Sequence, residues 1–294
     1  AGVLGKKADM LPMGVEVSLG KNEPKTFNVR VARHSTLLPS LVFAALSNAV
    51  DMEGELPDES TARVEARIEL ENGRVLRFSD TLSGMSASRA PMALFSPIAS
   101  AVSQLSHNPF KELKAKRISC TAKVEASRTT ADLDAMELDR AVYAPGDTVK
   151  ATVWLKPWRG GRERVEVSLK LPDDMPEGEH SAIACDGATS ARQDVRNHPG
   201  LMFPMSAEQV VDSLEALSKA RRTALALRVP LGVHGVVSGG KALPTLPGSV
   251  AHILASSKRT GALSLTRAAV ARKETGWVIL GSDTATFTVS KTRR

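Results

Sequence analysis

The sequence predicts a mainly β protein with α+β parts, built around a central immunoglobulin-like antiparallel β-sandwich that α+β segments flank. Two observations carry this prediction. Between residues 111 and 200 the chain holds five or six short alternating segments separated by turn signals, which is typical of a sandwich. On either side, strand-like alternation is mixed with helical spacing. With 294 residues, the chain is long enough for two or three domains with cores of ordinary size.

The first predicted domain covers residues 1–110 and follows the order hairpin, helix, hairpin, helix. In the second hairpin, Asn72-Gly73 supplies the positive φ angles of a tight turn. One antiparallel sheet with two helices on one face would bury all the apolar surfaces of these elements. The expected ranges are 14–33 and 62–82 for the hairpins and 39–52 and 91–106 for the helices.

The second predicted domain, residues 111–200, is the sandwich. A strand near 118–126 opens it, and Val149, Ala151, Val153 and Leu155 alternate cleanly in another strand. Gly160-Gly161 then turns the chain into a partner strand. Residues 188–204 are polar and rich in turn formers, and they predict a linker. The third predicted domain, residues 201–294, is α+β. It starts with a helix whose capping box pairs Ser206 with Gln209.

The composition argues against several classes of function. The net charge is +7, but Lys and Arg alternate with Asp and Glu, which is typical of a solvated surface. We therefore expect no nucleic-acid partner, because such proteins cluster their charge and interleave aromatic residues. No apolar run approaches the roughly 20 residues that a membrane span needs. The six histidines show no metal-site spacing, so neither a metal nor a cofactor is expected.

Cys120 and Cys185 are the only cysteines of the chain. Cys120 lies on the apolar face of its strand, and Cys185 shares parity with Ile183, so both are predicted to point into the sandwich core. In an oxidising compartment they would form a disulfide. Two buried free thiols are the alternative, because unpaired cysteine is among the most buried residue types.

Trp154 and Trp158 are the predicted partner contacts. Trp154 falls on the polar face of its strand, so it should be exposed unless another domain or subunit covers it. Trp158 lies in the turn that follows. Either the two side chains contact a partner, or Trp154 packs under a neighbouring domain of the same chain.

Two short stretches partly match functional motifs, one of a catalytic serine and one of a phosphate-binding loop, and an ordinary loop is the better prediction for both. Ser86 sits in Gly-Met-Ser-Ala-Ser, which lacks the second glycine of a chymotrypsin-like nucleophile motif, and its conceivable partners are His34 and Asp80. A loop leading into a helix is the better prediction. The glycine-rich stretch 232–240 lacks the Gly-Lys-Ser/Thr ending of a phosphate-binding loop, and it predicts a surface loop.

Several motifs together resemble one protein family. They include ALSNAVDMEG, SHNPFKELKAKRI, VYAPGDTVKATVWLKPWRGG, LPDDMPEGEHSAIACDGATSAR and SGGKALPTLPGSV. These stretches are similar to the non-catalytic region that follows the peptidase domain in SpoIVB-type serine peptidase family proteins of the bacterial cell envelope. The resemblance spans most of the chain. The family's catalytic motif, Gly-x-Ser-Gly-Ser-Pro, has no counterpart here, so no catalytic residue is carried over.

The resemblance implies an extracytoplasmic location and a non-catalytic interaction or structural module, expected to act as the accessory region of such a peptidase. Its partner would be a protein or a neighbouring domain. Because the sequence begins with Ala1 and shows no signal segment, we expect a processed fragment or a stand-alone relative. Two alternatives stay open: a serine peptidase whose site the sequence does not reveal, and a polyanion-binding envelope protein that uses the +7 surface.

Overall fold

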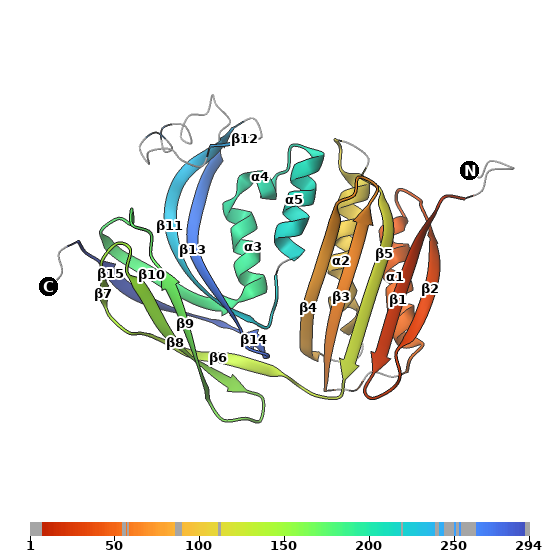
Figure 1. Cartoon of the computed structure of the whole chain (residues 1–294), viewed down its shortest axis with the longest axis horizontal. Coiled ribbons are helices and arrows are strands. Elements are labelled where there is room, and N and C mark those ends of the chain that lie inside the picture. The colour runs from red at the N-terminus through yellow and green to blue at the C-terminus, as the bar shows by residue number, and fades with distance from the viewer. Residues whose placement is uncertain are drawn as a thin grey trace. The chain divides into compact units, whose positions relative to one another are not determined.

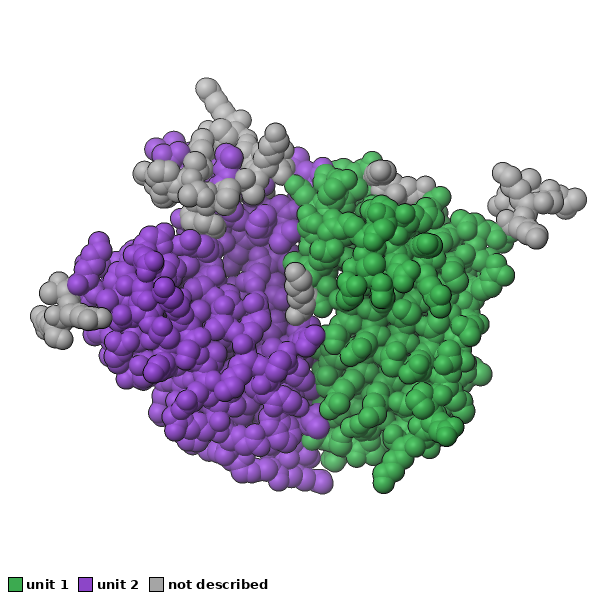
Figure 2. Space-filling view, viewed as in Figure 1, with its two compact units in different colours: residues 1–128, 206–219 green, residues 129–205, 220–294 purple. Residues whose placement is uncertain are grey.

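The computed structural model describes most of the chain as two compact units (Figures 1 and 2). Unit 1 comprises Ala1–Arg128 and Ser206–Lys219, and unit 2 comprises Thr129–Met205 and Ala220–Arg294. The chain therefore passes from one unit to the other three times. The described residues are 8–54, 57, 59–85, 90–110, 113–218, 220–238, 241–243, 250, 253 and 263–291.

Unit 1 contains a five-stranded sheet with the strand order β2-β1-β5-β3-β4. Strands β1 and β5 run parallel, and the other neighbours are antiparallel. Each strand alternates apolar and polar residues, so one face of the sheet is buried and the other is open. The strands are β1 (Met10–Leu19), β2 (Lys25–Ala32), β3 (Ser60–Leu70), β4 (Val75–Met85) and β5 (Ala115–Glu125).

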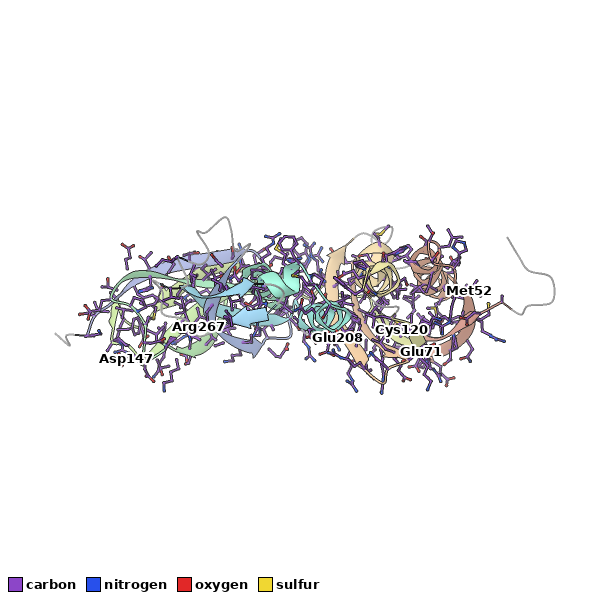
Figure 3. The ribbon with its side chains drawn as sticks, turned by 90° about the horizontal axis from the view of Figure 1, so that it is seen from above. Met52, Glu71, Cys120, Asp147, Glu208 and Arg267 are labelled. Atoms are coloured by element: carbon purple, nitrogen blue, oxygen red, sulfur yellow. The ribbon has the colours of Figure 1, made fainter. Side chains whose placement is uncertain are left out.

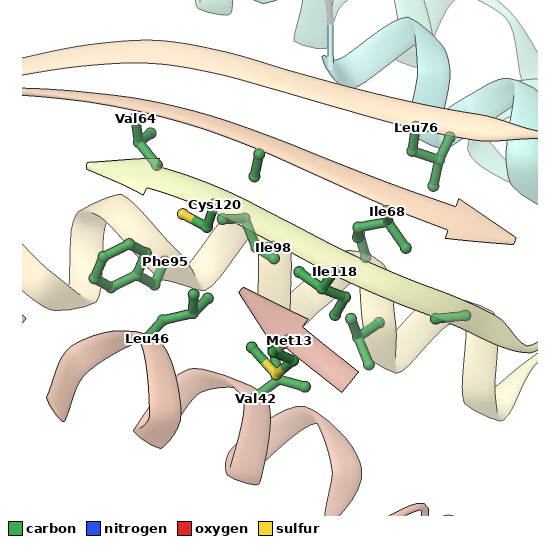
Figure 4. Close-up of a cluster of buried hydrophobic side chains, with 14 of the residues drawn as sticks. Met13, Val42, Leu46, Val64, Ile68, Leu76, Phe95, Ile98, Ile118 and Cys120 are labelled. Atoms are coloured by element: carbon green, nitrogen blue, oxygen red, sulfur yellow. The ribbon is translucent and has the colours of Figure 1, made fainter. Parts of the chain in front are cut away.

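Two helices, α1 (Leu38–Asp51) and α2 (Ala90–His107), lie side by side on one side of this sheet (Figures 1 and 3). Pro97 lies inside α2, which continues on both sides of it. The apolar stripes of both helices and the buried face of the sheet form one core, in which Ile118 and Phe95 are fully buried (Figure 4). The layering of two helices on one face of a sheet is as expected, but the sheet is mixed rather than purely antiparallel, because β5 joins it and runs parallel to β1.

A third helix, α5 (Ala207–Ser218), completes unit 1 although it follows most of unit 2 in sequence. Its buried face, which includes Val210 and Leu214, joins the core beside β4 and α2. The Ser206 hydroxyl caps the helix by accepting a hydrogen bond from the Gln209 N–H at 3.2 Å. Arg74, after β3, donates from Nη2 to carboxylate oxygens of two α5 residues, Asp212 and Glu215, each at 2.8 Å.

Unit 2 is a β-sandwich whose two sheets share one core. From the first sheet, Val153 and Leu155 point inward, and from the second, Leu225, Leu227 and Phe287 meet them. The first sheet has the order β14 (Val278–Leu280), β6 (Thr130–Leu138), β8 (Thr148–Pro157) and β9 (Glu163–Lys170). The second has the order β12 (Lys241–Leu243), β11 (Ala224–Ser238), β10 (Gly178–Asp186), β15 (Ser282–Val289) and β7 (Val142–Tyr143), with β13 (Leu263–Glu274) paired to β11.

Tyr143 anchors one end of the sandwich. Its ring is buried and packs edge-on against Phe287, with 5.3 Å between the ring centroids. Its hydroxyl donates to Asp139 Oδ1 at 2.7 Å and accepts a hydrogen bond from the Arg140 backbone N–H at 3.3 Å. Burial, followed by the hydrogen bond to Asp139, raises the pKa of the Tyr143 phenol well above its usual range. Tyr143, the first residue of the Tyr-Ala-Pro-Gly-Asp motif, therefore has a structural role, because it joins the segment before β7 to β15.

The expected fold class is confirmed: the protein is mainly β, with a β-sandwich and α+β parts. The three expected domains, with boundaries at 110/111 and 200/201, differ from the two units. Strand β5 pairs with β1 and β3 in unit 1, and β11 and β15 pair with β10, so strands of the expected third domain belong to the sandwich. Among the described residues, no helix is long and apolar enough to cross a membrane.

Two local predictions are wrong. Residues 188–204 are not a linker, because α3 (Gly187–Asn197) and the short α4 (Pro199–Met202) occupy most of this range. The expected loop at 232–240 is instead strand as far as Ser238, where β11 pairs with β12 and β13. The next two residues, 239 and 240, lie outside the described residues.

Candidate interaction surface

The two candidate tryptophans lie on the β8–β9 hairpin of unit 2. Because Val153 and Leu155 point into the sandwich core, the side chain of Trp154 must project from the opposite face of β8. There it is half-buried. Trp158 follows the strand, and its side chain is 42% exposed. The strand parity in the sequence predicted the direction of Trp154 correctly.

An arginine lies over each tryptophan ring. The Arg162 guanidinium is 5.4 Å from the centroid of the Trp154 ring, and the Arg159 guanidinium is 5.6 Å from that of Trp158. Arg162 also forms an ion pair with Asp134, on the neighbouring strand β6. Such cation–π contacts contribute about 0.5–1 kcal/mol each at exposed sites. They hold both rings in defined orientations at the surface.

The backbone of the hairpin tip is strained at one position. Arg159 has φ +58°, and it is the one non-glycine residue with positive φ among those that the structure describes. The left-handed conformation costs a side-chain-bearing residue roughly 1–2 kcal/mol. The turn is fixed by two backbone hydrogen bonds, from Trp158 N–H to Thr130 O and from Gly160 N–H to Pro157 O. The sequence offered no signal for this conformation.

Positive charge gathers on the same hairpin. Trp154 lies opposite Arg164 in the β8–β9 register, and Lys156 projects from the same face two residues further on. The acidic residue of the tip, Glu163, accepts a hydrogen bond from the Trp277 indole N–H at 2.8 Å, so it is engaged elsewhere in unit 2. We call Trp154, Trp158, Arg159, Arg162 and Arg164 the Trp–Arg surface. It can stack on planar groups and pair with carboxylates.

The two cysteines are not brought together. Cys120 lies in the core of unit 1, where Figure 4 shows it among Phe95, Leu46 and Ile98, whereas Cys185 lies on β10 of unit 2. Both are buried free thiols. The disulfide that one interpretation of the sequence expected is therefore absent. Forming it would require a strand to leave its sheet, because each thiol is enclosed within a different unit.

Neither thiol suits nucleophilic chemistry. Burial raises the pKa of the Cys120 thiol to about 12. Burial, and then the charge of Asp186, raise that of Cys185 to about 11. Because the thiolate is the nucleophilic form, both groups are inert near neutral pH.

The other candidates from the sequence are Ser86 and its two hypothetical partners, and the structure does not bring the two described ones, His34 and Asp80, together. Ser86 lies outside the described residues. His34 follows β2 and Asp80 lies on β4, and these strands are the two opposite edges of the unit 1 sheet. Within the described ranges, no group of His, Cys, Asp or Glu side chains is arranged to hold a metal ion.

A buried arginine that the sequence did not single out joins α3 to the second sheet of the sandwich. Arg228, on β11, has 2% of its side chain exposed. It donates from Nη1 to the Ser190 carbonyl oxygen at 2.7 Å and to the Ser190 hydroxyl at 2.9 Å, and its Nη2 lies 3.0 Å from Asp194 Oδ1. Arg272, on β13, donates to the other Asp194 oxygen at 2.9 Å. We call these four residues the α3 clamp.

No family model, curated protein or solved structure matches this chain. Its function is therefore inferred from the surfaces and pockets of the chain itself.

Proposed function

We propose that this chain is a non-catalytic extracytoplasmic interaction module, the accessory region of a SpoIVB-type serine peptidase, and that it binds a protein partner through the Trp–Arg surface. The observation that supports this proposal is the pair of outward-facing tryptophans, each with an arginine lying over its ring. Tryptophan and arginine are the residues most enriched among the side chains that dominate protein–protein binding energy.

Two features of the hairpin favour a binding role over a solvated face. First, large aromatic side chains are costly to leave in water, and interface cores often bury them. Second, Arg159 adopts a left-handed backbone conformation that is costly for a residue with a side chain, and such outliers concentrate at functional sites. The partner should present carboxylates around an apolar patch, because the cations of the hairpin outnumber its acids.

Site-specific photocrosslinking tests this proposal. Benzoylphenylalanine would replace Trp158, and the matched control would carry it at Val142, an exposed apolar position on β7 of the same unit. We expect the Trp158 variant to capture one envelope protein, which a fluorophosphonate probe then labels as a serine peptidase. Identical crosslinks at both positions, or a captured protein without a reactive serine, would overturn the proposal.

Substitution then measures how much the surface contributes to binding. Trp154→Ala should weaken binding to the captured peptidase at least tenfold, or about 1.4 kcal/mol. Thr152→Ala on the same strand face should change binding by less than twofold. If the purified chain itself were labelled by the fluorophosphonate, it would be a peptidase rather than an accessory region.

A polyanion is the second candidate ligand for this surface, because Lys156, Arg159, Arg162 and Arg164 fall within nine residues beside two aromatic rings. Retention on heparin that falls with salt, and falls further in Arg162→Ala, would favour it. Unchanged retention in that variant would assign any polyanion binding to the diffuse surface charge.

A further inference from the structure

A small pocket lies at one end of the unit 1 sheet, where β1 begins, β2 ends and β5 begins. Its volume is about 180 Å³. At roughly 30 Å³ for each water molecule in the liquid, this space would hold about six waters. It lies below the 300–1,000 Å³ that is typical of drug-sized ligands. The pocket therefore suits a small molecule or one terminal residue of a polypeptide.

One wall of the pocket is aliphatic. Val102 and Leu105 come from α2, Leu38 from the start of α1, and Leu113 from the residues before β5. All four side chains are buried, so their positions are set by the core behind them. A branched or linear aliphatic group of a few carbons would bind roughly fourfold more tightly for each methylene that it buried against this wall.

The rest of the lining carries hydrogen-bond donors, and Arg33 among them is held by two contacts. Its side chain is only 14% exposed. Its Nε lies 3.0 Å from Asp9 Oδ1, and its Nη1 donates to the Ala115 carbonyl oxygen at 2.6 Å. These contacts use two of the five guanidinium N–H groups and hold the planar group in place. The Nη2 hydrogens make no hydrogen bond to any described residue, so they remain for a ligand.

His34 adds a second donor to the pocket lining. Its Nδ1 accepts a hydrogen bond from the Thr36 backbone N–H at 3.3 Å, which places the remaining ring proton on Nε2. Asp9 is the one acidic residue among the described lining residues, and it contacts the Nε side of the Arg33 guanidinium. The Nη2 hydrogens of Arg33 and the Nε2 hydrogen of His34 are therefore donors that a carboxylate could accept.

We propose that this pocket binds a carboxylate carried on a short aliphatic group. A guanidinium that is already held on one side can pair with a carboxylate on its other side without a further loss of side-chain entropy. The aliphatic wall then takes the carbon chain. Two sources share this chemistry: a free short-chain carboxylate, and the C-terminal residue of a polypeptide that ends in Leu, Ile or Val. The pocket lies within unit 1, so this inference does not depend on the Trp–Arg surface of unit 2.

Calorimetric titration of the full chain with three probes tests the proposal. The probes are 4-methylpentanoate, a blocked dipeptide that ends in leucine with a free carboxylate, and the same dipeptide as its C-terminal amide. We expect at least one carboxylate probe to bind and the amide to bind at least tenfold more weakly. The tighter of the two carboxylates identifies the source. Equal binding of amide and acid, or no binding of either carboxylate, would overturn the proposal.

Variants locate the binding. Ser106, on α2, lines the pocket, and Ser106→Phe should fill it and abolish binding. The control Gln104→Phe places the same side chain at an exposed α2 position that does not line the pocket, and it should bind as the wild type does. Arg33→Lys keeps the positive charge but removes the forked N–H donors, so it should weaken carboxylate binding about fivefold and leave the amide unchanged, which keeps the test valid if Ser106→Phe misfolds. Full binding by a folded Ser106→Phe protein, or by Arg33→Lys, would refute the assignment.

Discussion

Asp194→Ala should destabilise unit 2 far more than the partial exposure of Asp194 suggests. The substitution removes the carboxylate that pairs with both Arg228 and Arg272 in the α3 clamp. Leaving a buried charge without its partner costs about 3–5 kcal/mol. The Asp194 side chain is 39% exposed, so water takes over part of its role. We therefore expect a loss of about 2–3 kcal/mol in the free energy of unfolding.

Arg228→Met should cost only about 1 kcal/mol, because it removes the charge together with its desolvation penalty and keeps an apolar side chain of similar length. Asp194 then keeps its ion pair with Arg272. In the double variant, which combines Asp194→Ala with Arg228→Met, no buried charge is left unpaired. We therefore expect the double variant to be more stable than Asp194→Ala alone, so that the second substitution rescues the first.

Urea unfolding followed by tryptophan fluorescence measures these differences. The three tryptophans, at positions 154, 158 and 277, all lie in unit 2, so their emission reports on the unit that contains the clamp. If the double variant lost the sum of the two single effects, the charge coupling that we infer would be refuted. An Asp194→Ala variant within 0.5 kcal/mol of the wild type would refute the burial argument as well.

Three further predictions follow from packing and ionisation. Tyr143→Phe removes the hydroxyl that donates to Asp139, and it should lower the free energy of unfolding by about 1–2 kcal/mol, measured in urea. Cys120 and Cys185 should resist iodoacetamide up to about pH 9 and react fully in denaturant, because burial raises the pKa of both thiols. For the same reason, the free energy of unfolding should fall as the pH rises above the pKa of an unfolded thiol. Fast native alkylation would contradict their burial. Gly187→Ala should destabilise unit 2, because the added Cβ would lie 2.6 Å from a backbone carbonyl oxygen, whereas unchanged thermal unfolding would show that the helix start can shift.

Short sequence patterns predicted the secondary structure correctly where the pattern of apolar residues or a turn dipeptide alone decides the local conformation. The alternation around Trp154 predicted its outward direction, and Asn72-Gly73 predicted the β3–β4 turn, where Gly73 has φ +87°. The helix that includes Pro97 was also found. By contrast, α3 was missed because its buried positions are Gly, Ala and Ser, whose packing leaves no apolar stripe to detect.

Long-range pairing escaped the sequence altogether. The strand that carries Cys120 alternates as a sandwich strand would, and only its partners β1 and β3 place it in unit 1. The tip conformation at Arg159 has no residue signature, because left-handed backbone there is imposed by the turn rather than favoured by arginine. Likewise, the Arg33 pocket gathers residues from four separate stretches of the chain, and no short motif joins them.

Because α5 comes late in the sequence, the nascent chain can complete unit 1 only after the first part of unit 2 has been synthesised. A ribosome releases all five strands of unit 1 once residue 125 has emerged, yet the helix beside β4 is complete only at Ser218. During that interval, the apolar surface that α5 covers in the finished protein stays open to water. Factors that hold exposed apolar surface would therefore act on this chain midway through translation.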